Sequence, residues 1–255
     1  MIKTTRWLAA LVISACLIAP AAAESEGLLT DTRITVSGDV SFFSEYVWRG
    51  MLLDGDSVVQ PGLYVASPAT KFGALTAKFW SSHDLQNADS RHSEEYDYTF
   101  DYTYSFKDIS ISLGHTYYDF PETDLFSREF YAGLAFPKIL LNPSVFVYRD
   151  YGEPEDGGGE GTYTVLSGAY SIPITVMTYA CSLDLSGHYG YNHELFINGK
   201  GGDIGLGAGF SVPLAKNATL VPNVNYSIAL SDLEKESDGN QKERVFAGLT
   251  LKFSL

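Results

Sequence analysis

Residues 96–106 read Y-D-Y-T-F-D-Y-T-Y-S-F, a stretch in which every even-numbered residue is aromatic and every odd-numbered residue is polar. Side chains of a β-strand point alternately to opposite faces, so this pattern predicts a strand with one aromatic and one hydrophilic face. Its length fits the roughly 9–11 residues that a tilted strand needs to cross a bilayer. The stretch therefore indicates one strand of an outer-membrane β-barrel.

The same alternation recurs along the rest of the chain. It predicts strands at 34–48, 60–66, 73–81, 94–106, 109–118, 126–136, 144–151, 162–171, 176–191, 203–212, 219–230 and 244–255. Short turns follow every second strand, at 67–71, 107–108, 137–140, 172–174 and 213–217. The other connections are longer and are acidic or glycine-rich, which is the asymmetry of bacterial outer-membrane barrels. We therefore predict an all-β, transmembrane, antiparallel up-and-down β-barrel of about 12 strands with both termini in the periplasm.

Alternation alone does not show which face of a strand lies inside. A soluble, lipocalin-like barrel would turn the aromatic face inward. The regular loop asymmetry, the charges and glycines on the polar face, and the Tyr and Trp residues near strand ends favour a membrane barrel with aromatic residues outward.

The N-terminal residues have the features of an export signal. Lys3 and Arg6 precede an apolar run at 7–18, and Ala21-Ala22-Ala23 forms a small-residue cleavage site. We predict a signal peptide at 1–23, a short periplasmic lead at 24–32 and the barrel at 33–255. As an alternative, the sequence I-S-A-C ending at Cys16 resembles a lipobox, in which that cysteine would be lipidated.

The composition excludes several classes of function. The chain has 17 Lys+Arg against 31 Asp+Glu, and removing the two basic residues of the signal would change its net charge from −14 to −16. Such acidity argues against nucleic acid as a partner. No long apolar run follows the signal, so we expect no spanning helix, and no nucleotide or redox-cofactor motif is present.

Three short segments resemble one family of bacterial outer-membrane proteins. They are S-E-Y-V-W-R-G at 44–50, Q-P-G at 60–62 and G-T-Y at 161–163. Together they resemble the TorF-type porins, the Gcw_chp family, although the order of Gln60, Pro61 and Gly62 differs from the family's usual arrangement. The resemblance implies an outer-membrane barrel with a transport role. The alternating apolar residues from Val245 to Leu255 also resemble the C-terminal strand through which the barrel assembly machinery recognises its clients, with Leu where Phe or Trp is usual.

Strand parity places nine acidic and four basic residues on the inner face. The acids are Asp39, Glu45, Glu95, Asp97, Asp101, Glu129, Asp150, Asp184 and Asp203, and the bases are Arg49, Lys78, Arg244 and Lys252. We predict that the pore is lined by Glu45, Arg49, Lys78, Asp97, Asp101, Glu129, Asp150, Asp184 and Arg244. Carboxylate rings favour the passage of cations. Alternatively, these charges pair across the lumen and hold it shut, since twelve strands lie between a filled barrel and an open channel.

Arg49 is the sharpest single candidate. At the outer end of the first strand, it would act as a constriction residue that orients anionic groups of a solute. The competing interpretation is a salt bridge to Glu45 or to an acid on the next strand.

An enzyme and a metal-binding protein are weaker hypotheses. Asp184, Ser186 and His188 share one face of a strand, but neighbours at that spacing are about 6–7 Å apart, too far for direct hydrogen bonds. The acidic loops 152–160 and 231–243 lack the spacing of a calcium loop and are typical of solvated loops. We expect no catalytic residues and no metal.

The sequence as a whole favours a porin-like channel in the bacterial outer membrane for small hydrophilic solutes or cations. A non-conducting structural or surface-interaction barrel is the first alternative, and a lipid-modifying enzyme is the second. The expected partners are outer-membrane lipid and lipopolysaccharide, the barrel assembly machinery and small hydrophilic solutes, without nucleic acid.

Overall fold

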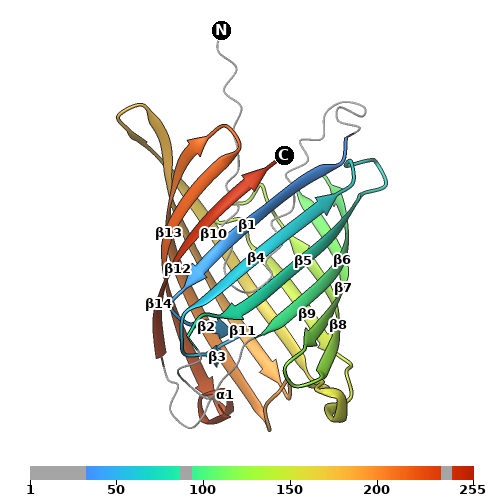
Figure 1. The fold of residues 1–255 in the computed structure, drawn as a ribbon. Coiled ribbons are helices and arrows are strands. Elements are labelled where there is room, and N and C mark those ends of the chain that lie inside the picture. Colours follow the sequence, from blue (N-terminus) through green and yellow to red (C-terminus); the bar gives the residue numbers. More distant parts are fainter. Residues whose placement is uncertain (1–32, 87–93, 237–242) are drawn as a thin grey trace.

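The computed structural model describes residues 33–86, 94–236 and 243–255, and within them the chain forms a closed barrel of twelve antiparallel strands (Figure 1). The barrel strands are β1 (Thr35–Phe43), β4 (Val58–Ala66), β5 (Ala74–Asp84), β6 (Glu95–Phe106), β7 (Ile109–Phe120), β8 (Leu125–Ala135), β9 (Ser144–Asp150), β10 (Thr162–Val176), β11 (Tyr179–His193), β12 (Lys200–Ala215), β13 (Ala218–Ser231) and β14 (Glu243–Ser254). The other elements are β2 (Tyr46–Trp48), β3 (Met51–Asp54), the 3₁₀ helix η1 (Pro154–Asp156) and α1 (Asp232–Glu236). The predicted signal peptide, Cys16 and the lead at 24–32 lie outside the described residues.

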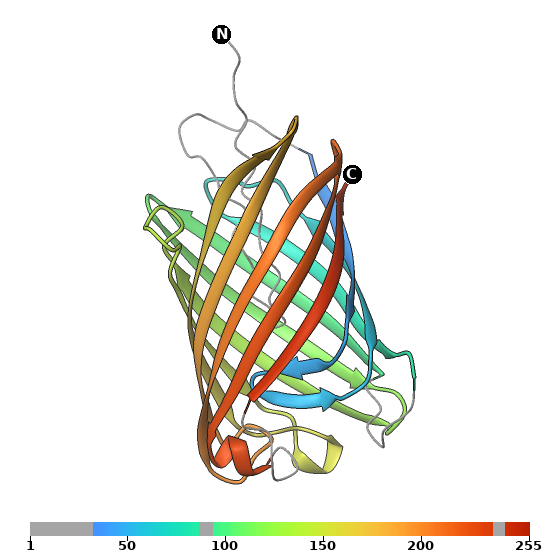
Figure 2. The same ribbon diagram turned by 90° about the vertical axis from the view of Figure 1, so that its left-hand side faces the viewer.

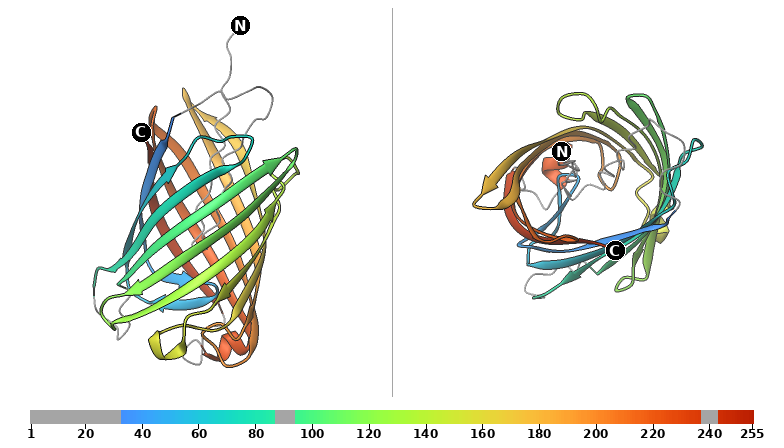
Figure 3. Two further views of the ribbon diagram at one scale, coloured as in Figure 1. Left: turned by 90° about the vertical axis from the view of Figure 1, so that its right-hand side faces the viewer. Right: turned by 90° about the horizontal axis from the view of Figure 1, so that it is seen from above.

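Each barrel strand pairs with its neighbour in sequence, and β1 closes the ring. Phe42 of β1 lies opposite Val59 of β4 on one side and opposite Leu249 of β14 on the other. Seen from above in Figure 3, the strands close into a single oval ring. The predicted fold class is confirmed. No described helix is long and apolar enough to cross a membrane.

Polar and aromatic side chains of β6 lie on opposite faces of the wall, as the alternation in the sequence predicts. Asp97 and Asp101 are 6% and 2% exposed on the inner side, whereas Tyr98 and Phe100 are 43% and 67% exposed on the outer side. Because the aromatic residues point outward, the alternative of a soluble barrel with an aromatic interior is wrong.

The two ends of the barrel differ. The start of β1 and the C-terminus lie at one end, which is the predicted periplasmic end, and η1, α1 and the β2–β3 hairpin lie at the other (Figure 1). Two predicted turns are misplaced at the first end. Residues 172–174 belong to β10, whose turn to β11 falls at 177–178, and β12 continues as far as Ala215 instead of ending before Pro213.

Each misplaced turn contains a proline, Pro173 or Pro213, that the structure places within a strand. β9 pairs with β10 only as far as Ser167, so Pro173 lies in a segment with a strand neighbour on one side alone. Pro213 lies at a register shift between β12 and β13. Edge segments and bulges are the positions at which a sheet tolerates proline.

The first predicted strand is too long. A continuous strand at 34–48 is wrong, because β1 ends at Phe43 and the chain then turns into the barrel. There β2 and β3 form a two-stranded sheet that is separate from the wall. Figure 2 shows this pair, hereafter the inner hairpin (residues 46–54), inside the barrel towards the end that carries α1.

Glycines on the inner face make room for aromatic rings of the next strand. Gly114 lies opposite Tyr131, and a Cβ atom at Gly114 would lie 2.1 Å from Cζ of that ring. The Tyr131 hydroxyl donates a 2.8 Å hydrogen bond to Asp101 across the glycine. The ring therefore fills the space that a side chain at position 114 would need.

We expect Gly114→Ala to lower the free energy of unfolding by about 1–3 kcal/mol, because the added methyl group overpacks this site. Urea unfolding in lipid vesicles, followed by tryptophan fluorescence, measures the change. Gly187→Ala is the matched control, since the nearest atom to its Cβ would be the flexible end of Leu206 at 3.2 Å. Equal midpoints for the two variants would contradict the packing argument.

Candidate functional site

The residues predicted to line a pore lie on the inner face of the wall or on the inner hairpin, except Glu45, which lies in the bend between β1 and the hairpin. Five carboxylates on the wall are almost fully buried: Asp97, Asp101, Glu129, Asp150 and Asp184. Arg49 is buried in the hairpin, and Glu45, Lys78 and Arg244 are partly exposed. Strand parity therefore predicted the direction of the wall residues correctly, and their role in a pore stays a prediction.

Arg49 and Gly50 form the turn of the inner hairpin. Trp48 pairs with Met51, so these two residues are the whole loop, and both have positive φ, 49° and 77°. Positive φ at both central residues is the mark of the type I′ turn that best joins two twisted strands. A Cβ at Gly50 would lie 2.6 Å from Cβ of Asp203 on β12, so the turn reaches the wall.

The turn places Arg49 opposite Glu129 of β8. The guanidinium donates two hydrogen bonds to the carboxylate, of 2.7 and 2.8 Å, and the Tyr118 hydroxyl donates a third of 2.9 Å. The side chains of Arg49 and Glu129 are 4% and 1% exposed. The interpretation that Arg49 pairs with Glu45 or with an acid on the adjacent strand is therefore wrong, because its partner lies on a distant strand.

Three aromatic rings surround the same guanidinium. Its carbon lies 4.3 Å from the ring centroid of Trp48, 4.4 Å from that of Tyr148 and 4.7 Å from that of Tyr163. A desolvated cation–π contact is worth up to about 2 kcal/mol. The rings come from the hairpin, β9 and β10, so they join the turn to a part of the wall beyond Glu129.

Further contacts fix the rest of the inner hairpin. Tyr46 donates a 3.0 Å hydrogen bond to Glu95 of β6, and Glu45 forms a 3.4 Å ion pair with Arg244 of β14. Trp48 packs against three separate apolar clusters of the interior. The hairpin therefore contacts several sides of the wall, and the outer half of the lumen has a packed centre.

Residues of the outer loops also close over this centre. Leu195, in the connection between β11 and β12, and Leu233 of α1 are fully buried. Asp232 begins α1, and a hydrogen bond from Lys235, assisted by one from the Lys200 amide, lowers the pKa of its exposed carboxyl. The connection that carries Leu195 and the helix α1 are thus held against the mouth of the barrel.

The row of Asp184, Ser186 and His188, which we considered as the weaker enzyme hypothesis, is not joined by hydrogen bonds between its members. His188 is held by Asp203, 2.7 Å from its Nε2 atom, instead of by a residue of its own strand. Ser186 donates to the backbone oxygen of Gly207 and makes no hydrogen bond to His188. Asp203 also accepts a 2.9 Å hydrogen bond from Tyr163, so this network supports the ring that covers Arg49.

The periplasmic half of the lumen carries a second set of polar groups. Asp184 accepts hydrogen bonds from Ser171, Ser182 and Ser211, which belong to three adjacent strands. Asp39 accepts a 2.8 Å hydrogen bond from Tyr64. Lys252 of β14 lies opposite Asp39 and shares this region with both carboxylates, so hydroxyl donors and one cation hold the acids of the inner face.

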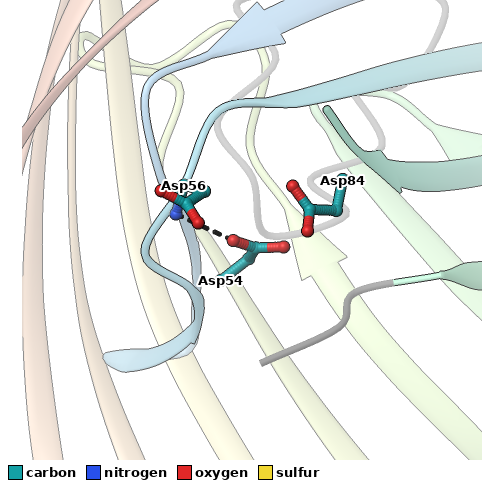
Figure 4. A group of neighbouring side chains, drawn as sticks. All are labelled: Asp54, Asp56 and Asp84. Atoms are coloured by element: carbon teal, nitrogen blue, oxygen red, sulfur yellow. Dashed lines mark hydrogen bonds between the residues drawn. The ribbon is translucent and has the colours of Figure 1, made fainter. Parts of the chain in front are cut away.

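One acidic group could offer ligands to a metal ion. Asp54, Asp56 and Asp84 lie where the inner hairpin leaves the lumen, with a carboxylate oxygen from each within 4.8 Å of the others (Figure 4). Oxygen atoms are the ligands of hard divalent cations. All three residues make additional interactions, and the Asp56 amide donates a 2.8 Å hydrogen bond to Asp54. We treat the group as part of the rim of the barrel.

The comparisons with known proteins identify the class of fold. The NanC porin covers 86% of this chain and 100% of its own, with 8% identity and a TM-score of 0.52. The KdgM porin covers 86% of this chain and 99% of its own, with 12% identity and a TM-score of 0.51. The COG4313 outer membrane channel of Pseudomonas putida F1 covers 93% of this chain and 100% of its own, with 10% identity and a TM-score of 0.50. No family model and no curated protein matches the chain. The protein therefore has the fold of bacterial outer-membrane barrels.

Removing the Arg49 side-chain charge should release the inner hairpin. For Arg49→Gln we expect hydrogen exchange of the amides at 46–54 to rise about 100-fold, because loss of one partner of a buried ion pair costs about 3–5 kcal/mol. Exchange followed by mass spectrometry on the folded barrel measures this. Arg244→Gln is the control, since its partly exposed pair with Glu45 is worth less than about 1 kcal/mol. Equal protection in both variants would contradict the role of Arg49.

Proposed function

We propose that this protein is a narrow outer-membrane channel for the passive diffusion of small hydrophilic solutes, with a preference for cations. The observation that carries the proposal is the acidic inner face of a closed barrel. Eight of the predicted inward acids are almost fully buried in its wall: Asp39, Glu95, Asp97, Asp101, Glu129, Asp150, Asp184 and Asp203. Carboxylate-lined passages lower the electrostatic barrier to cations and raise it for anions.

The inner hairpin would form the narrowest part of the passage. It contacts β6 and β8 through the side chains of Tyr46 and Arg49, and Glu45, which precedes it, contacts β14, so solutes would pass beside it. Arg49 is engaged by Glu129, and an anionic solute would have to compete with that carboxylate. This arrangement favours the passage of small cations. It argues against the role that we first considered for Arg49, which was to orient anionic groups of a solute.

A non-conducting barrel is the second candidate. The packed outer half of the lumen, where Tyr163 and Leu195 are fully buried, favours it. In that case the acidic external loops would carry the activity. A lipid-modifying enzyme receives no support from Asp184, Ser186 and His188, because His188 and Ser186 bond to other groups, and we propose no catalytic residue and no cofactor.

We further propose membership of the TorF-type porin family. Two segments that carry the resemblance, at 44–50 and 161–163, contain Arg49 and the Tyr163 ring that covers it at 4.7 Å. A shared structural unit of this kind would explain why the resemblance is concentrated in these short segments. Assembly through the outward-facing residues of β14, such as Val245 and Leu249, belongs to the same proposal.

Current across a planar bilayer tests the channel. We expect discrete conductance steps with a cation-selective reversal potential, and Asp97→Asn with Asp101→Asn should move that potential towards zero because two lumen charges are lost. Glu122→Gln with Asp124→Asn removes the same charge from an exposed outer turn and should move it much less. A folded barrel that stays silent would reject the channel and favour the second candidate.

A further inference from the structure

Two arginines face outward on the wall of this acidic protein. Arg128 of β8 lies on the outer face with Phe126 and Phe130, and Arg149 of β9 lies on that face with Val147. Arg128 is the fourth residue of its strand and Arg149 the last but one of its own, so both lie towards the outer end of the barrel. Charged side chains on a lipid-facing surface are costly unless they reach polar headgroups.

Neither arginine forms an ion pair with a residue that the structure describes. Arg128 lies over the rings of Phe126 and Tyr151, at 5.4 and 5.2 Å, and its Nε atom is buried without a hydrogen-bond partner. Arg149 makes one long hydrogen bond, of 3.4 Å, to Thr162. Both guanidinium groups therefore keep donors for an external anion.

Aromatic residues fix the surface between the two cations. Tyr151 stacks on Phe130 with ring centroids 5.0 Å apart and an interplanar angle of 15°. The Tyr151 hydroxyl lies 2.8 Å from Nε2 of His115 on β7. The result is a rigid basic and aromatic surface, hereafter the outer basic patch (His115, Arg128, Arg149 and Tyr151).

An apolar groove of about 960 Å³ begins at this patch and crosses the outer wall from β9 to β4. Its floor includes the small side chains of Ala77 and Ala132, and its sides are formed by larger ones: Leu75, Phe100, Leu113, Phe130 and Val147. Five interstrand spacings give it a length of about 24 Å. Because barrel strands are tilted, a groove that runs across them descends obliquely into the membrane.

We propose that this surface binds the lipopolysaccharide of the outer leaflet, with its phosphate groups on the outer basic patch and an acyl chain in the groove. Charge complementarity carries the choice of occupant. Guanidinium groups bind phosphate through two parallel hydrogen bonds, and Arg128 and Arg149 are available at headgroup depth on a protein whose net charge is −14. The groove continues from the cations, as an acyl chain continues from a phosphorylated headgroup.

Native mass spectrometry of the full barrel in detergent, titrated with lipid A, tests the proposal. We expect saturable binding that weakens at least about tenfold in Arg128→Gln with Arg149→Gln, since each cation near a lipid headgroup contributes about 1 kcal/mol. Lys107→Gln with Lys216→Gln removes the same charge at the periplasmic turns and should leave binding unchanged. Arg149→Lys keeps the charge but loses the paired donors, so its affinity should lie between those of the unmodified barrel and Arg149→Gln.

Two further comparisons separate lipopolysaccharide from other occupants. Lipid A without phosphates and phosphatidylglycerol should both bind at least about tenfold more weakly than intact lipid A. Ala132→Phe fills the groove and should weaken binding, whereas Ala247→Phe adds the same ring to an exposed site on β14. If the double arginine variant bound lipid A as tightly as the unmodified barrel does, or if phosphatidylglycerol bound as tightly as lipid A, the assignment would be overturned. If Ala132→Phe left the binding of lipid A unchanged, the groove would not be part of the site.

Discussion

Closure of the sheet is the constraint on which the rest of this structure depends. Inside a bilayer no water is present to bond an exposed strand edge, so every backbone polar group of the wall needs a partner within the sheet. β1 meets this need by pairing with both β4 and β14. Once the ring is closed, alternation sends every second side chain into the lumen, and the polar face of each strand becomes buried. The interior must then satisfy its own charges.

The buried pair of Arg49 and Glu129 is one answer to that requirement. Burying two charges costs several kcal/mol per ion, and only good geometry with additional hydrogen bonds offsets it. Here the carboxylate receives three donors and the guanidinium is enclosed by three rings. Such a pair adds little to stability compared with apolar packing, but it specifies where the inner hairpin lies. Position, more than stability, is what the proposed narrow passage would need.

The strands could be predicted from the sequence because alternation is a local signal that survives small errors in boundaries. The inner hairpin could not, since Tyr46 and Trp48 continue the parity of β1 after the chain has left the sheet. Its only local signal is Arg49-Gly50, a pair that suits a type I′ turn less obviously than Asn-Gly. The partner of Arg49 is 80 residues away in sequence, so no spacing rule identifies it. Likewise, Pro173 can lie within β10 because β9 stops pairing with that strand at Ser167, and this end point depends on a different segment of the chain.

Alternation also explains how one wall carries opposite charges on its two sides. Arg128-Glu129 and Arg149-Asp150 are adjacent pairs in sequence, and each pair sends its acid inward and its arginine outward. Glu129 and Asp150 are themselves opposite each other on β8 and β9, where one holds the inner hairpin and the other accepts bonds from the outer loop at Gly152 and Gly159. The inward acids thus organise the lumen, while the outward arginines supply the cations of the proposed lipopolysaccharide site. A one-residue slip of either strand would exchange the two roles, so both surfaces depend on the same register.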